Sequence, residues 1–229
     1  MKRFFLFCNM DKKQLIEKTR AYVKESLKGA EGGHDWFHIE RVYNNAKLIA
    51  KEEDVDLFVV ELGALLHDIA DSKFHDGDEG IGPKKAASFL EDIKVPADII
   101  EHIVNIIIHV SFKSGLESGE AVKFNSPELQ VIQDADRLDA IGAIGIARAF
   151  NYGGFKNRSL FDPEIAPKLN QDKETYKKSK APTINHFYEK LLLLKDKMNT
   201  ETGKRIAEKR HAFMEQFLKE FYNEWQGKI

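Results

Sequence analysis

Apolar residues recur along this chain at the spacing of an α-helix, and this periodicity limits the possible folds more than any other feature. In residues 11–28 the apolar positions fall on one stripe, as in an amphipathic helix. The same pattern predicts further helices at about residues 35–53, 56–70, 84–94, 96–110, 128–150, 183–198 and 201–224. No alternation typical of a β-strand is longer than four residues, and no internal repeat occurs. The sequence therefore predicts an all-α fold.

Three segments between these helices lack a clear period and are expected to be loops, at residues 71–83, 111–127 and 151–182. The last is rich in Gly, Pro, Asn and Lys and is long for a connection without structure of its own. We interpret it as a lid or binding loop, or as a partly disordered segment. The chain of 229 residues is long enough for one large domain or two small ones, and we expect one domain, residues 1–229.

The charges of the chain are nearly balanced, with 35 basic and 37 acidic residues and a formal net charge of −2. A protein that binds nucleic-acid polymers through their phosphates needs a basic surplus, so this class is not expected. A small anionic ligand needs only a local cluster of cations, so the charge balance does not exclude one.

Cys8 is the single cysteine, so neither an intramolecular disulfide nor a thiolate zinc site is expected. The apolar run at residues 4–8 is too short for the core of a signal peptide. No segment approaches the roughly 20 apolar residues of a membrane span. We therefore expect a cytoplasmic protein without a membrane partner.

A pair of adjacent polar residues, His67 and Asp68, interrupts the apolar sequence ALLHDIA. An ionised carboxylate among apolar residues is costly unless it is paired or bound to a cation. A buried His–Asp hydrogen bond between helices is one interpretation. A metal site is the other, because His38 and Asp136 lie on two other predicted helices. The helix of Asp136 also carries Asp134 and Asp139, and a shared cation would satisfy all of these polar residues at once. Two imidazoles and two carboxylates suit Mn, Fe, Zn, Co or Ni and tolerate Mg.

The order of these four residues resembles that of the HD-domain metal-dependent phosphohydrolases. The resemblance extends to four blocks: GHDWFHIERV, ELGALLHDIADSKF, DADRLDAIGAIGIARAF and TINHFYEKLLLLKDKMNT. They are similar to a small bacterial HD subgroup of nucleotide phosphohydrolases and pyrophosphohydrolases, over roughly residues 20–222. The resemblance implies a helical bundle with one divalent cation between central helices. The HD core would be about residues 20–150, with the loop 151–182 and helices 183–224 packed on it.

The activity that the resemblance implies is hydrolysis of a phosphate ester or phosphoanhydride, with a nucleotide as the expected substrate. A nucleoside triphosphate pyrophosphohydrolase and a nucleotidase both fit. The alternative is a non-catalytic HD module that binds a metal or senses a ligand. The expected partner is a small phosphorylated substrate, and a homodimer is compatible with the sequence.

Two acidic residues that follow the His–Asp pair, Asp71 and Asp76, are the catalytic candidates. In related HD nucleotidases an acidic residue at each of these offsets assists catalysis, and a carboxylate near the cation could position the attacking water. On a helix that continues past Asp68, Asp71 would lie near the metal. Both residues could equally be solvated surface charges.

Three cationic or polar residues are predicted to contact the substrate: His34, Lys73 and Arg137. Lys73 would act as a point charge on phosphate and Arg137 as a two-pronged donor. Salt bridges to nearby carboxylates are their alternative role. His102 and His109, seven residues apart, have the spacing for a second metal, although isolated histidines on half-buried helices are more often structural.

Overall fold

The computed structural model describes residues 11–30, 33, 35–69, 80–110, 124–169 and 179–228. Within these residues every regular element is a helix, so the predicted all-α fold is confirmed. Among the described helices, none combines the length and the apolar character that crossing a membrane requires.

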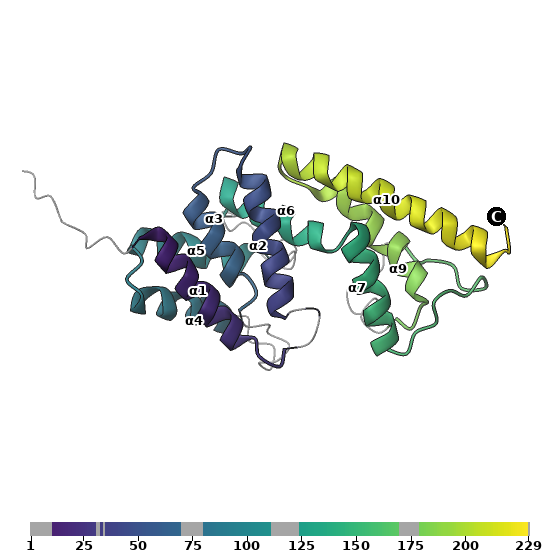
Figure 1. The fold of residues 1–229 in the computed structure, drawn as a ribbon, viewed down its shortest axis with the longest axis horizontal. Coiled ribbons are helices and arrows are strands. Elements are labelled where there is room, and N and C mark those ends of the chain that lie inside the picture. Colours follow the sequence, from purple (N-terminus) through teal and green to yellow (C-terminus); the bar gives the residue numbers. More distant parts are fainter. Residues whose placement is uncertain are drawn as a thin grey trace, which may run out of the picture.

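The first part of the chain, which we call the N-terminal lobe, contains the helices before residue 140 (Figure 1). They are α1 (Lys12–Ser26), α2 (Trp36–Ala50), α3 (Leu57–Leu66), α4 (Ile81–Asp92), α5 (Ala97–Val110) and α6 (Pro127–Asp139). α3 is buried on all sides, because α1, α2, α5 and α6 pack around it. It lies at the centre of the lobe, as its almost continuous apolar sequence predicts.

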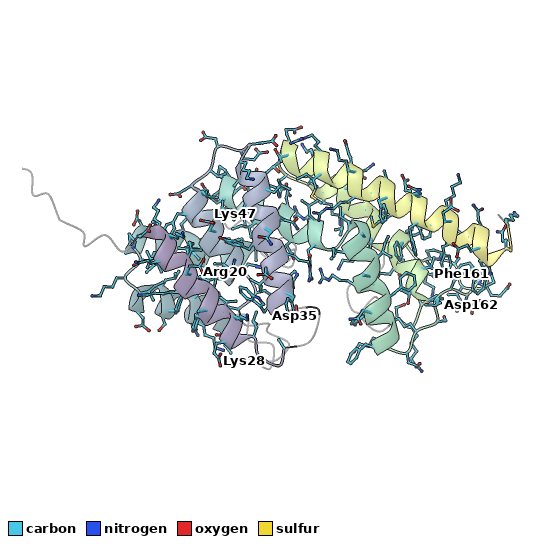
Figure 2. The ribbon with its side chains drawn as sticks, viewed as in Figure 1. Arg20, Lys28, Asp35, Lys47, Phe161 and Asp162 are labelled. Carbon is cyan, nitrogen blue, oxygen red and sulfur yellow. The ribbon has the colours of Figure 1, made fainter. Side chains whose placement is uncertain are left out.

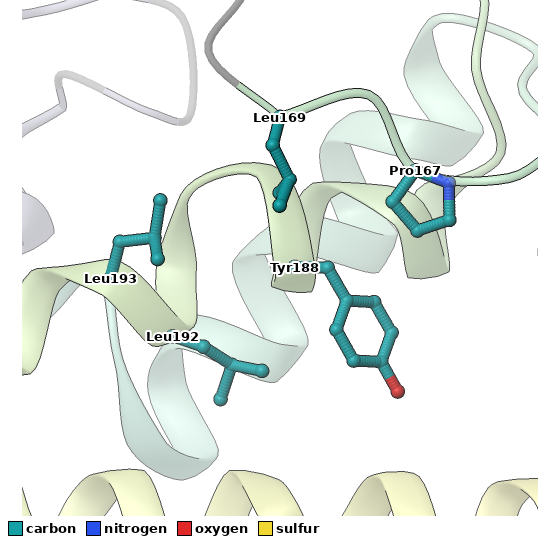
Figure 3. A pocket seen from close by; sticks show the side chains of 5 residues that line it. All are labelled: Pro167, Leu169, Tyr188, Leu192 and Leu193. Atoms are coloured by element: carbon teal, nitrogen blue, oxygen red, sulfur yellow. The ribbon is translucent and has the colours of Figure 1, made fainter.

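The remaining helices form the C-terminal lobe, which Figure 1 shows at the far end of α6. They are α7 (Gly142–Phe155), α9 (Thr183–Glu189), the 3-10 helix η3 (Leu191–Lys197) and α10 (Glu201–Trp225). α10 packs against α7, η3 and α6, so it runs along this lobe and reaches the N-terminal lobe. An apolar hollow of about 390 Å³ on the C-terminal lobe is lined by Pro167, Leu169, Tyr188, Leu192 and Leu193 (Figure 3).

Side-chain caps fix where several of these helices begin. Asp35, which Figure 2 shows at the start of α2, accepts a hydrogen bond from the backbone N–H of His38 at 2.9 Å. Asp56 and Ser126 cap α3 and α6 in the same way, and Pro127 occupies the first turn of α6. Such caps satisfy backbone N–H groups that have no partner inside the helix.

Three predicted helices differ from the observed elements. The helix predicted at 128–150 is two helices, α6 and α7, because the backbone is extended at Ile141 and has a positive φ of 75° at Gly142, where α7 begins. The segment 183–198 divides into α9 and η3. The helix predicted at 56–70 ends at Leu66, so His67 and Asp68 lie in the turn after it and not inside it.

Candidate metal centre

The position of His67 follows from the end of α3. His67 is the residue that directly follows the helix, and its side chain turns back so that Nδ1 lies 2.8 Å from the backbone oxygen of Ala64. A carbonyl oxygen can only accept, so Nδ1 must carry the proton of this hydrogen bond. The other nitrogen, Nε2, is therefore the one that would bind a metal.

His38, in the first turn of α2, is oriented by an acid from α6. His38 is only 2% exposed, and its Nδ1 lies 2.8 Å from Oδ2 of Asp139. Burial alone would raise the pKa of Asp139, but hydrogen bonds from His38 and Arg41 and the charge of Arg148 outweigh it and hold that pKa far below its usual value. Asp139 is therefore an ionised acceptor, and Nδ1 of His38 is the donor. Nε2 of His38 is consequently the nitrogen that would bind a metal here as well.

These two imidazoles and Asp68 converge on one point. One ligand atom from each of His38, His67 and Asp68 lies within 4.8 Å of the others, and the two rings are 5.5 Å apart between centroids. Within the part of the chain that the structure describes, no other such group of three exists. His38 lies on α2, and His67 and Asp68 lie in the turn after α3; these two helices pack directly against each other.

Asp136 lies beside this cluster. Its Oδ1 is 3.5 Å from Nε2 of His38, and its side chain is 44% exposed. A cation bound between His38 and Asp136 could therefore take one ligand atom from each. The residues therefore fit a divalent cation, with one nitrogen from each of two histidines and charge from two carboxylates.

Two arginines around Asp139 were not identified from the sequence. Arg41 of α2 donates from Nε to Oδ1 of Asp139 at 2.6 Å, and Arg148 of α7 donates to Oδ2. The signal available in the sequence was Asp139 itself, one helical turn after Asp136. An acid at a buried position must have partners, but the sequence does not indicate which cations supply them.

The third acid of α6, Asp134, belongs to a different network. It is fully buried and accepts hydrogen bonds from the backbone N–H groups of Asn199 and Thr200 and from the Thr200 hydroxyl. The expectation that one cation satisfies all three acids of this helix is therefore wrong for Asp134. Arg137 donates to Asp134 at 3.1 Å. This salt bridge is the alternative to a substrate contact that was expected for Arg137.

The two further histidines lie apart from the cluster. Nε2 of His102 lies 3.0 Å from the hydroxyl of Ser126, and Nδ1 of His109 lies 2.8 Å from the backbone oxygen of Asn105. Both rings pack against Phe124. These contacts give each histidine a structural role and do not bring the pair to the cluster.

Four predicted site residues lie outside the described residues: His34, Asp71, Lys73 and Asp76. Their roles stay predictions. The argument that placed Asp71 near the metal on a continuing helix does not hold, because α3 ends at Leu66. The hollow of Figure 3 contains none of the predicted site residues.

Comparison with known proteins agrees with this geometry. The family model of the HD domain matches residues 36–141, which include His38, His67, Asp68 and Asp136. The Bacillus subtilis (strain 168) protein YpgQ is 37% identical over 92% of this chain and 94% of YpgQ. A crystal structure of an HD-superfamily hydrolase from Bacillus thuringiensis is 42% identical with a TM-score of 0.76, covering 95% of this chain and 100% of that one.

A further structure is that of Bacillus subtilis YpgQ in complex with ADP, with a TM-score of 0.71 and 34% identity over 93% of this chain and 96% of YpgQ. These similarities extend over nearly the whole length of the chain, well beyond the residues that the family model matches. The ordered His, His-Asp and Asp residues, the helical fold and the relatives together show that this chain belongs to the HD superfamily of hydrolases.

Proposed function

We propose that this protein is a metal-dependent phosphohydrolase that cleaves a phosphate ester or phosphoanhydride of a nucleotide. One divalent cation would be held by His38, His67, Asp68 and Asp136. The observation that carries the proposal is the cluster itself, in which His38 of α2 and His67 of the turn after α3 each use Nδ1 in a hydrogen bond, so that Nε2 is the nitrogen that would face the cation, beside Asp68.

The residues of the chain have separate tasks in this proposal. A cation bound here lowers the pKa of water and polarises a phosphate oxygen. The hydrogen bonds of Nδ1 hold each imidazole in its tautomer and orientation, so the site needs little rearrangement when it is loaded. Asp68 and Asp136 supply the negative charge. Asp136, whose side chain is 44% exposed, would lie on the side from which the substrate enters.

The nucleotide is supported by the relative YpgQ, which has been crystallised with ADP and resembles this chain over nearly its full length. ADP combines a base, a sugar and a phosphoanhydride. Both a nucleoside triphosphate pyrophosphohydrolase and a nucleotidase would recognise such a ligand. Asp71 and Asp76 are proposed to handle the attacking water, and His34 and Lys73 to contact the phosphates, whereas Arg137 is already paired with Asp134.

The test is a panel of nucleoside mono-, di- and triphosphates assayed for released phosphate and pyrophosphate with Mn²⁺, Mg²⁺ or Co²⁺. We expect turnover with at least one cation, none after chelation, and loss of both metal and turnover in Asp68→Ala. Asp92→Asn, an exposed acid on α4, is the matched control and should behave as wild type. A protein that binds metal and nucleotide but releases no product would instead be a ligand-sensing module.

A further inference from the structure

The corner between α6 and α7 returns the chain toward the metal centre. Gly142 has a φ of 75°, a conformation that residues with a Cβ rarely adopt. Three residues later, a Cβ on Gly145 would lie 2.3 Å from the backbone oxygen of Ala140. Only glycine allows this approach, which holds the start of α7 against the end of α6.

This corner brings Arg148, in the second turn of α7, back onto Asp139. One guanidinium nitrogen, NH1, donates to Oδ2 and, at 3.1 Å, to the backbone oxygen of the same residue. The other, NH2, donates at 3.1 Å to the backbone oxygen of Gly33, just before α2. Arg148 therefore joins three segments: α7, the end of α6 and the chain that leads into the helix of His38.

The Asp139 carboxylate is held from several directions. Arg41 bonds both of its oxygens, at 2.6 and 3.1 Å, and Arg148 and Nδ1 of His38 share Oδ2. A carboxylate fixed in this way cannot rotate about its Cβ–Cγ bond without breaking charge-assisted hydrogen bonds. The plane and position of the carboxylate in turn direct the imidazole of His38.

The same contacts argue against a direct role of these arginines on phosphate. Their guanidinium groups already bind a carboxylate, and Asp35 contributes further negative charge beside Arg41. The two cations are thus balanced by two acids. Moreover, they contact Asp139, which bonds Nδ1 of His38, the nitrogen on the side of the ring opposite to Nε2.

We propose that Arg148 is a positioning residue of the metal centre, which fixes the Asp139 carboxylate and through it keeps Nε2 of His38 directed at the cation. This rests on the metal site of the proposed function but not on its substrate. Arg148 lies after residues 36–141, the part that matches the HD family model. The C-terminal lobe thereby supplies a part of the metal centre that the matched core lacks.

The test measures Co²⁺ binding to the metal-free protein by isothermal titration, with the visible absorption of bound Co²⁺ as a second readout of ligand geometry. Arg148→Met keeps much of the side-chain volume and loses the charge and all the donors. We expect it to bind Co²⁺ about 10–100-fold more weakly than wild type, the usual effect of losing a group that orients a metal ligand. Its Co²⁺ spectrum should also be altered. Arg148→Lys restores a charge but not the fork that spans Asp139 and Gly33, so its affinity should be intermediate.

The matched control is Arg205→Met. Arg205 also connects the C-terminal lobe to the N-terminal lobe, through a 2.6 Å ion pair with Glu52, but has no contact with Asp139. It should bind Co²⁺ as wild type does. A folded Arg148→Met with the Co²⁺ affinity and spectrum of wild type would refute the positioning role. An unchanged Co²⁺ affinity together with a raised Michaelis constant for nucleotide would also refute it, because that result indicates a contact with phosphate. If Arg148→Met does not fold, Arg148→Lys decides by the same criteria. Absence of Co²⁺ binding in wild type would instead refute the metal site of the proposed function.

Discussion

Oδ2 of Asp139 lies 2.8 Å from Nδ1 of His38, so a buried acid on α6 fixes the tautomer of a buried imidazole on α2. If Arg148 acts only through this acid, its loss should matter only while the acid is intact. We therefore expect Asp139→Asn to weaken Co²⁺ binding about 10–100-fold. The double variant Asp139→Asn/Arg148→Met should be no weaker than Asp139→Asn alone. Losses that multiply in this double-mutant cycle, measured by titration, would mean that Arg148 acts independently of Asp139.

Substituting Gly145 provides a test that leaves every polar group of the centre in place. In Gly145→Ala the new Cβ would overlap the backbone oxygen of Ala140, so the start of α7 must move and take Arg148 with it. We expect lower metal affinity and a lower melting temperature. The control is Gly154→Ala in the same helix, where a Cβ meets no atom within 4 Å. That variant should be neutral, or more stable by up to about 1 kcal/mol. Equal Co²⁺ affinities in the two variants would contradict the expectation.

Asp134 should matter for stability. It accepts hydrogen bonds from the backbone N–H groups of Asn199 and Thr200 and from the Thr200 hydroxyl, which attaches the start of α10 to α6. In Asp134→Asn an NH₂ group would face these donors in a fully buried place. We expect the free energy of unfolding in urea to fall by about 3 kcal/mol. A loss below about 0.5 kcal/mol, the scale of a surface substitution, would show that Asp134 is not a buried anchor.

His186 in α9 predicts how stability depends on pH. Burial, followed by the positive charges of Lys190 and Arg158, lowers its pKa from 6.5 to about 4. In the unfolded chain His186 takes up a proton as the pH falls below about 6.5, whereas in the folded protein it does so only near pH 4. The unfolded state therefore binds more protons in this window, and the free energy of unfolding must fall as the pH decreases from 6.5 to 4.

The check is urea unfolding of wild type and His186→Gln at several pH values between 4 and 6.5. The variant should lose less stability across this window than wild type, because it lacks the group that titrates. Identical pH dependences would assign the effect to other groups.

Residues whose chemistry requires a partner, such as histidines and acids among apolar residues, could be predicted from the sequence. Contacts that depend on where the chain turns could not. Periodicity located most of the helices, and His38, His67 and Asp68 could be grouped because polar residues in apolar helices need a shared partner. The break at Gly142 was missed because the apolar pattern runs through it without interruption. Arg148 was missed because its contact with Asp139 depends on that break, and Asp134 was misassigned because its partners, Asn199 and Thr200, lie on a distant segment.

The hydrogen bond from Arg148 to the backbone oxygen of Gly33 has a thermodynamic consequence for the whole chain. If docking of the C-terminal lobe raises the affinity for the cation by some factor, the bound cation must favour docking of that lobe by the same factor, because the two equilibria are linked. Loading the metal site should therefore slow amide hydrogen exchange in α7, on the opposite side of Asp139 from the bound ion, and should do so much less in Arg148→Met. A cation held by residues of α2 and of the turn after α3 would in this way stabilise the docked position of α7, a helix that provides none of its ligands.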